Sequence, residues 1–158
     1  MQKRVLTILS CVALLNLSSW AANNKAGRAA AGPLPDKAYL QKILDGWSTL
    51  DPQKQGQFYA SGEHTFFDVA PLKYNSWQEY EAGVSKELAD YKSATFTLND
   101  DAQIHPAGNY VWATATFKED ATLKSGKRDL ATFRWTLVFE NQGGKWLLVH
   151  EHASEPMQ

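Results

Sequence analysis

The first half of the chain carries hydrophobic residues at helical spacing. Between positions 39 and 50 they recur one, three and four residues apart, which predicts a helix that buries one face and ends by Asp51 and Pro52. These residues are Tyr39, Leu40, Ile43, Leu44, Trp47 and Leu50. Asp51 and Pro52 are also typical of an N-cap and a first helical position, so they predict a short second helix that carries Phe58 and Tyr59 to its end.

A third helix is predicted from a capping signal followed by a further apolar stripe. Ser76 and Glu79 stand three residues apart, which is the spacing of a capping box at a helix N-terminus. The stripe that follows consists of Tyr80, Val84, Leu88 and Tyr91. The helical part of the chain therefore comprises three helices that precede all of the long strands.

From about position 92 onward, apolar and polar residues alternate, which is typical of strands. Turn signals separate four such runs, at 93–105, 109–119, 130–140 and 145–154, and a shorter run lies at 65–69. Because the connections are short, we expect an antiparallel meander. The predicted fold class is α+β, with three N-terminal helices packed on a curved antiparallel sheet of four to six strands.

The last two runs carry large apolar residues on both faces. In the run 130–140, Trp135 and Leu137 share one face, while Arg134 and Val138 share the other. In the run 145–154, alternation places Leu147, Val149 and Glu151 opposite Trp146, Leu148, His150 and His152. A sheet with one solvent-facing side would alternate cleanly, so we expect a second copy to cover this face in a two-fold homodimer.

The N-terminal segment has the pattern of a cleavable export signal. Lys3 and Arg4 precede an apolar run at 5–17 that is too short to span a bilayer, and small residues predict cleavage after Ala21. We therefore interpret 1–21 as a signal peptide, 22–35 as a flexible linker and 36–156 as one domain. The expected location is the periplasm or the extracellular medium, and we expect no membrane association of the mature form.

Composition and charge narrow the possible partners. The single cysteine, Cys11, lies in the signal, so the mature chain is expected to have no disulfide, no thiolate nucleophile and no Cys-ligated metal. The formal net charge is −1, and loss of Lys3 and Arg4 lowers it to about −3. No stripe of basic residues is present, which argues against nucleic-acid binding. Nucleophile-elbow and phosphate-loop motifs are also absent from the sequence.

The segment GGKWLLVHEHASEP at 143–156 resembles the last strand of the nuclear transport factor 2-like superfamily. It is most similar to the SnoaL-like branch and to the association domain of calcium/calmodulin-dependent protein kinase II. Upstream segments resemble the same branch in order and spacing: FFDVAP at 66–71, SWQEY at 76–80, IHPAGNYVWATATF at 104–117 and FRWTLVFE at 133–140. The resemblance covers about 36–156, as a single SnoaL-like domain.

This resemblance implies a cone, in which helices fold over a bent sheet and enclose a pocket, with homodimers common. The same fold serves isomerases, dehydratases, cyclases, non-catalytic binding domains and oligomerisation hubs, so it does not define one function. We expect a small, mostly apolar ligand and no cofactor.

Isomerase or dehydratase chemistry needs a carboxylate base that reaches an acidic carbon, with Tyr, His or a protonated acid at the oxygen. Asp68 and Glu151 are the candidate bases, although Asp68 also fits a turn-capping role before Ala70 and Pro71. His150 and His152 leave one face of a strand and are candidate catalytic residues. Their spacing also occurs in zinc sites, but no third ligand is indicated, so we predict no metal.

Arg134 lies in mid-strand among apolar residues, where it requires either a carboxylate partner or a cavity that receives an anionic or carbonyl group. The resemblance gives the cavity equal standing with a structural ion pair, because the related association domain places arginines in its pocket and SnoaL-like chains carry a similar Arg-x-Thr. Further candidate ligand-binding residues are Trp47, Tyr59, Phe67, Trp77, Trp112 and Thr114. The alternative for most of the aromatic residues among them is that they fill the core.

The sequence leaves two classes of function open. The leading hypothesis is an exported SnoaL-like homodimer that binds a small molecule and is, in its enzymatic version, a cofactor-free isomerase or lyase. The alternative is a non-catalytic interaction module like the kinase association domain, which predicts a filled cone. An immunity or scavenging protein would instead show a large partner surface.

Overall fold

The structure, a computed structural model, describes residues 32–157 of the 158-residue chain. The predicted signal peptide and most of the predicted linker lie outside the described residues. The elements follow in the order α1 (Lys37–Trp47), the 3₁₀ helix η1 (Pro52–Gln57), β1 (Glu63–Phe67), β2 (Tyr74–Ser76), α2 (Trp77–Leu88), β3 (Tyr91–Leu98), β4 (Gln103–Ala107), β5 (Tyr110–Leu123), β6 (Arg128–Gln142) and β7 (Lys145–Ser154).

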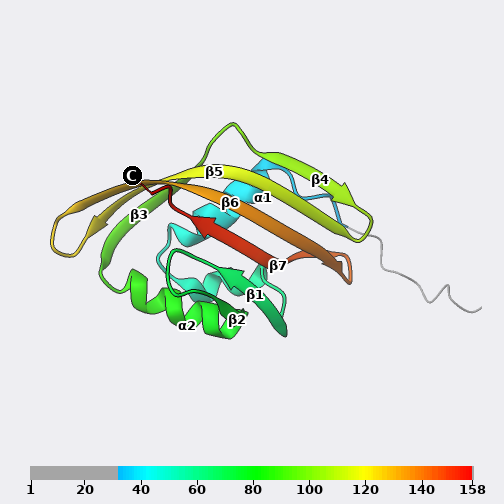
Figure 1. Ribbon diagram of the computed structural model, residues 1–158, viewed down its shortest axis with the longest axis horizontal. Coiled ribbons are helices and arrows are strands. Elements are labelled where there is room, and N and C mark those ends of the chain that lie inside the picture. The colour runs from blue at the N-terminus through cyan, green and yellow to red at the C-terminus, as the bar shows by residue number, and fades with distance from the viewer. Residues whose placement is uncertain (1–31, 158) are drawn as a thin grey trace, which may run out of the picture.

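One curled sheet contains all seven strands, in the order β2-β1-β7-β6-β5-β3, with β4 also paired to β5 (Figure 1). The α+β class is confirmed, but the sheet has more strands than expected and is mixed, because β1 pairs parallel to β7. The predicted run 93–105 divides into β3 and β4. At this break the side chain of Asp101 accepts hydrogen bonds from the backbone N and the Oγ1 of Thr116, at 2.9 and 2.8 Å.

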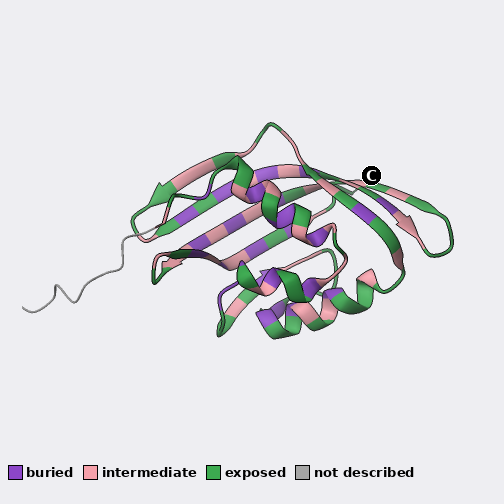
Figure 2. Cartoon of the chain, turned by 180° about the vertical axis from the view of Figure 1, so that it is seen from behind, coloured by how far each residue is buried: buried purple, intermediate pink, exposed green. Residues whose placement is uncertain are grey.

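Helices α1 and α2 lie on the same face of the sheet, as Figure 2 shows from behind. We call this the inner face. The amphipathic face predicted for α1 is buried against it through Leu40, Ile43, Leu44 and Trp47. Trp135, Leu137 and Phe139 of β6 are buried on the inner face, which confirms the alternation read from this run. The opposite, outer face is more exposed and carries Trp112 and Arg134.

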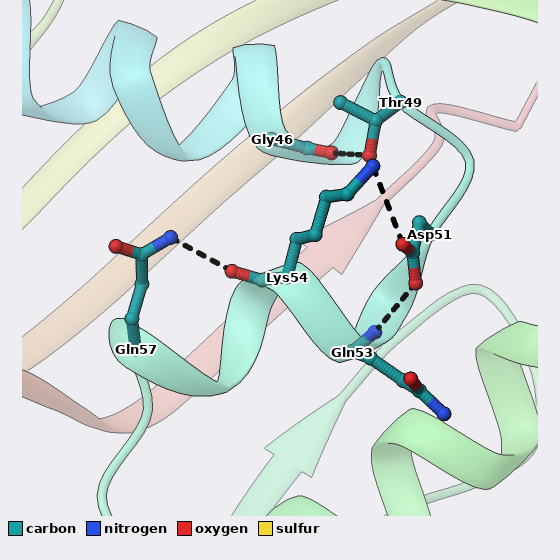
Figure 3. A network of polar contacts seen from close by, with 6 residues as sticks. All are labelled: Gly46, Thr49, Asp51, Gln53, Lys54 and Gln57. Atoms are coloured by element: carbon teal, nitrogen blue, oxygen red, sulfur yellow. Dashed lines mark hydrogen bonds and ion pairs between the residues drawn. The ribbon is translucent and has the colours of Figure 1, made fainter.

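The turn between α1 and η1 ends the first helix earlier than predicted. Leu50 has a φ of 57°, in the left-handed region, so it cannot continue the helix. Asp51 caps η1 as expected, because its Oδ1 accepts from the backbone N of Gln53 at 3.2 Å. A surface network holds the turn: Thr49 Oγ1 donates to Gly46 O, Lys54 Nζ pairs with Asp51, and Gln57 Nε2 donates to Lys54 O (Figure 3).

The turn and η1 position Phe58 and Tyr59 against the sheet. The buried side chain of Gln55 links η1 to α1 by donating to the carbonyl oxygen of Ile43 at 2.9 Å. Tyr59 then forms a parallel bridge with Leu148 of β7. This arrangement directs the Tyr59 ring into the core beside Glu151.

A β-bulge in β7 changes which residues face the helices. Phe139 pairs with Leu148, but the next residue of β6, Val138, pairs with His150, so Val149 is an extra residue on β7. Glu151 is consequently buried on the same side as Leu148, and the opposite placement expected from strict alternation is wrong. The bulge also places His150 and His152 on the outer face, opposite Leu148, so their expected position on the same face as Leu148 is wrong as well.

The described end of the predicted linker contacts the domain. Gly32 N donates to Gly144 O at 2.9 Å, and Trp146 Nε1 donates to Gly32 O at 3.2 Å. Pro35 is buried. Within residues 32–157, no helix is long and apolar enough to cross a bilayer.

Candidate functional site

A cavity of about 500 Å³ lies between the inner face of the sheet and the two helices. It extends from α1 to the C-terminal part of α2 and to the distal half of the β5–β6 hairpin, which projects beyond the helices (Figure 1). The residues that line it are Leu44, Trp47, Asp68, Val69, Ala70, Tyr80, Val84, Glu87, Leu88, Tyr91, Phe96, Phe117, Glu119, Asp129, Ala131, Phe133, Trp135, Glu151, Ala153 and Glu155. This size suits a small organic ligand.

Glu151 supplies the most buried carboxyl group of the cavity, with only 3% of the residue exposed. Its Oε1 accepts a hydrogen bond from Trp135 Nε1 at 2.6 Å, and its Oε2 accepts one from the Tyr59 hydroxyl. Burial raises the pKa of Glu151 to about 7, against the lowering effect of these two donors, and the charge of Asp68 raises it further. The group therefore can hold or release a proton near neutral pH.

Asp68 follows β1 and supplies a second carboxyl group to the same cavity. Its Oδ1 accepts from the backbone N of Val69 at 2.7 Å, and its Oδ2 accepts from the Tyr80 hydroxyl at 2.9 Å. Burial raises the pKa of Asp68, while these hydrogen bonds and the nearby His152 lower it. The bond to Val69 agrees with the predicted turn-capping role, and the bond to Tyr80 orients the carboxyl group within the cavity.

Glu87 and Glu119 are further acidic residues of the lining with raised pKa values. Burial raises the pKa of Glu119 to about 7, and the charges of Asp129, Glu155 and Asp68 add to this effect. Burial and the charge of Asp68 also raise the pKa of Glu87. Acidic side chains thus occur along the whole lining, and burial together with their mutual repulsion makes them hold protons more readily than free carboxyl groups.

Aromatic rings form much of the cavity wall. Phe117 and Phe133 stack with centroids 5.0 Å apart, and the ring of Trp135 meets Phe117 edge-on at 5.5 Å. Trp47 and Tyr80 lie on the helical side, with ring centroids 5.8 Å apart. The lining therefore combines apolar surface with a small number of polar groups, which is typical of ligand sites.

Five of the predicted site residues are in or next to the cavity. Trp47, Asp68 and Glu151 line it directly. Tyr59 lies one layer behind and reaches it only through its hydrogen bond to Glu151, while Trp77 stacks on Tyr59 at 4.2 Å. Both carboxylates proposed as bases therefore meet in one cavity.

The other predicted site residues lie on the outer face and do not line this cavity. Phe67 contacts the rings of His150 and His152, at 5.5 and 5.7 Å. Trp112 stacks on His105 at 4.0 Å. Thr114 pairs with Thr136 in the neighbouring strand, and Arg134 donates through Nη2 to the backbone oxygen of Glu155 at 3.0 Å.

The inner-facing Trp135 and the acidic residues Glu119 and Asp129 were not predicted as site residues. A signal was nevertheless present, because Glu119 follows Phe117 by two positions and Asp129 precedes Phe133 by four on their strands. An acidic residue in phase with core residues indicates a polar site within the core. Within residues 32–157, no group of three or more His, Cys, Asp or Glu side chains is arranged to hold a metal ion.

Solved structures of low sequence identity share this fold. A nuclear transport factor 2-like superfamily protein from Salmonella enterica Typhimurium has a TM-score of 0.67 at 19% identity, covering 77% of this chain and 91% of that protein. A Xanthomonas campestris protein proposed to be a calcium/calmodulin-dependent protein kinase II association domain has a TM-score of 0.66 at 20% identity, with coverages of 82% and 95%.

A Streptomyces avermitilis protein of the same fold, proposed to be a dehydratase, has a TM-score of 0.64 at 15% identity, covering 73% of this chain and 89% of that one. No curated protein matches the sequence. The SnoaL-like domain family matches residues 38–158, which includes every helix and strand described above except the first residue of α1. The chain therefore belongs to the SnoaL-like domain family, within the nuclear transport factor 2-like fold.

Proposed function

We propose that this chain is an exported protein that binds a small, mostly apolar molecule in its cavity and transfers protons there through Glu151. The observation that carries the proposal is the position of Glu151, a buried carboxyl group whose pKa is raised to about 7 and which lines the cavity. A general acid or base is most effective when its pKa lies near the working pH. The reaction class that this supports is cofactor-free isomerisation or elimination of water.

The neighbours of Glu151 define its role in such a reaction. The carboxylate takes a proton from a carbon next to a carbonyl group, and the resulting acid returns it to another carbon in an isomerisation. In a dehydration, the proton instead accompanies the leaving hydroxide, which departs as water. Tyr59 and Trp135 hold both oxygens in place, and Asp68 supplies the second titratable group. The proposed dehydratase from Streptomyces avermitilis, which shares the fold, supports this class of reaction.

A non-catalytic association module is the second candidate. The fold family includes association and oligomerisation domains, and the Xanthomonas campestris protein is proposed to be one. That function predicts a filled cone, whereas a cavity of about 500 Å³ favours ligand binding. We also propose that two copies pair through their outer faces, where Trp112 is 43% exposed. Pairing and ligand binding are compatible, because they use opposite faces of the sheet.

The proton-transfer proposal can be tested with 5-nitrobenzisoxazole, a flat neutral probe of buried bases. A carboxylate removes its ring C–H proton, the electron pair forms a nitrile, and the N–O bond breaks to give a coloured phenolate. We expect the wild-type protein to accelerate this reaction, with a rate that rises as the pH increases through about 7. Glu151→Gln should lower the rate at least about tenfold, because general-base catalysis is lost.

The matched control is Glu63→Gln, which neutralises an exposed carboxylate of β1 that does not line the cavity. Its rate should equal that of the wild type. A wild-type rate no higher than that of buffer, or full activity in Glu151→Gln, would overturn the catalytic proposal and favour the association module.

A further inference from the structure

The cavity is lined by acidic side chains and by no basic one. Six acidic residues line it, Asp68, Glu87, Glu119, Asp129, Glu151 and Glu155, whereas no Lys, Arg or His belongs to the lining. A field of one sign inside a low-dielectric cleft concentrates ligands of the opposite charge and repels those of the same charge. A lining of this composition favours cations over anions.

No lining carboxylate forms an ion pair with a Lys or Arg among residues 32–157, and the one basic side chain that acts on Asp68, His152, lies outside the lining. The two ion pairs between residues 32 and 157 join Asp51 to Lys54 and Asp120 to Arg128, and none of these four residues lines the cavity. Arg134 points to the outer face, where it donates to a backbone oxygen. Apart from the effect of His152 on Asp68, the acidic lining is thus not paired with a basic side chain from within this region.

Glu151 gives an independent indication of a ligand. It is buried, its two hydrogen bonds come from the neutral donors of Tyr59 and Trp135, and only acidic charge acts on it through space. A buried carboxylate without a countercharge is strongly disfavoured, and a cation placed beside it relieves that cost. Because Glu151 also lines the cavity, a ligand is in a position to supply the cation.

The walls indicate that this cation is organic. Trp47, Tyr80, Phe117, Phe133 and Trp135 present aromatic rings to the cavity, and such rings attract ammonium groups and pack against flat apolar bodies. Divalent metal ions instead require several converging oxygen ligands, and the described residues contain no such group.

We infer that the molecule held in this cavity is an organic cation, a protonated amine attached to a flat apolar body. This inference rests on the proposed binding function and adds the charge of the ligand. The ammonium lies among the carboxylates and donates hydrogen bonds to them, while the apolar body contacts the aromatic wall. Glu119 of β5 and Asp129 of β6 strengthen the attraction from the side of the β5–β6 hairpin.

Three probes of one shape and different charge test the inference: 1-naphthylmethylamine, 1-naphthylmethanol and 1-naphthoic acid. Their affinities are measured by isothermal titration calorimetry at neutral pH. We expect the amine to bind about 10 to 100 times more tightly than the alcohol, the range typical of hydrogen bonds to a charged group, and the acid to bind more weakly than the alcohol.

Variants then locate the source of the selectivity. Glu119→Gln should weaken binding of the amine about tenfold and leave the alcohol unchanged. Glu151→Gln should have the same effect, with circular dichroism checking that each variant is folded. The control Glu63→Gln, which removes an equal charge outside the cavity, should bind all three probes like the wild type.

The outcomes separate this inference from the proposed function. Equal affinity for the amine and the alcohol, or no binding of the amine, would overturn the inference. Displacement of the amine by Ca²⁺ alone would also overturn it, by indicating a metal site. If the amine is preferred but 5-nitrobenzisoxazole is not converted, the cation site stands and the catalytic proposal fails. If 5-nitrobenzisoxazole is converted but the amine is not preferred over the alcohol, the catalytic proposal stands and the cation inference fails.

Discussion

Glu151 is a carboxylic acid with two hydrogen-bond donors and no cation beside it among the described residues. The hydroxyl of Tyr59 and the indole of Trp135 favour its charged form, but burial outweighs them. Such a group is more readily protonated in the folded than in the unfolded chain. Its proton is therefore coupled to stability.

The sign of that coupling gives a prediction for stability against pH. Because the pKa of Glu151 rises from its ordinary 4.5 to about 7 on folding, the folded state binds the proton more tightly between these values. The contribution of Glu151 to the free energy of unfolding should be fully present below about pH 4.5. It should be lost as the pH rises through about 7. Glu119 acts in the same direction.

Thermal denaturation of wild type and Glu151→Gln checks this prediction. The melting temperature of the wild type should be higher at about pH 5.5 than at about pH 8, and the variant should show a smaller difference. The carboxylates with lowered pKa, including Glu79 and Asp101, lose their contribution only at more acidic pH. A variant with the pH dependence of the wild type would show that Glu151 is not the coupled group.

At the scale of elements, α2 depends on its N-terminal cap. The side chain of Ser76 accepts from the backbone N of Glu79 at 3.2 Å, and the Glu79 carboxylate accepts from the backbone N of Asn75 at 2.8 Å. The cap fixes the start of α2, and α2 positions Tyr80 so that its hydroxyl donates a hydrogen bond to Asp68. It therefore also positions one wall of the cavity.

Replacing the cap should destabilise the protein measurably. We expect Ser76→Ala to lower the free energy of unfolding by about 1 kcal/mol, because it leaves a helix N–H without its acceptor. Urea denaturation provides the measurement. Ser76→Asp, which retains an acceptor at the N-cap, should stay within about 0.5 kcal/mol of the wild type. An equal loss in both variants would indicate packing, and not capping, as the role of Ser76.

The features predicted correctly from the sequence are those that depend on residues close together in the chain. The caps at Asp51 and Ser76 depend on neighbours within three residues, so residue types alone identify them. The bulge at Val149 is different, because alternation assumes an uninterrupted ladder and a single extra residue reverses every face after it. The three-residue strand β2 is likewise too short to show any periodicity.

The candidate site was predicted only in part, because it too depends on how distant parts of the chain pack together. Asp68 and Glu151 were proposed from their chemistry, and both line the cavity. Arg134, His150 and His152, which were predicted as ligand-binding and catalytic residues, lie on the outer face and do not line the cavity. Glu119 and Asp129 were not predicted, because alternation does not tell which face of a strand borders a cavity, and only the tertiary packing shows that they turn inward.

At the scale of the whole molecule, the outer face predicts the state of assembly. We expect the wild type to be a homodimer and Trp112→Glu to raise its dissociation constant at least about tenfold, because a charge would replace an exposed aromatic side chain at the contact. Analytical ultracentrifugation measures the change. Leu72→Glu, at an exposed position in the loop between β1 and β2, is the control and should leave the dimer intact. A wild-type monomer, or a dimer unaffected by Trp112→Glu, would contradict the outer-face contact.

The place of β7 in the sheet constrains the order in which the chain can fold. Every element that β7 joins precedes it: β1 lies on one side and β6 on the other, and β1 connects to the rest of the sheet only through it. Until β7 has been synthesised, the edges of β1 and β6 that it pairs with remain unpaired, and unpaired strand edges are prone to aggregation. Folding is completed by contacts between distant parts of the sequence, which favours slow folding. The strand that joins β1 to the rest of the sheet also carries Glu151, so the complete sheet and the lining of the candidate cavity form in the same step.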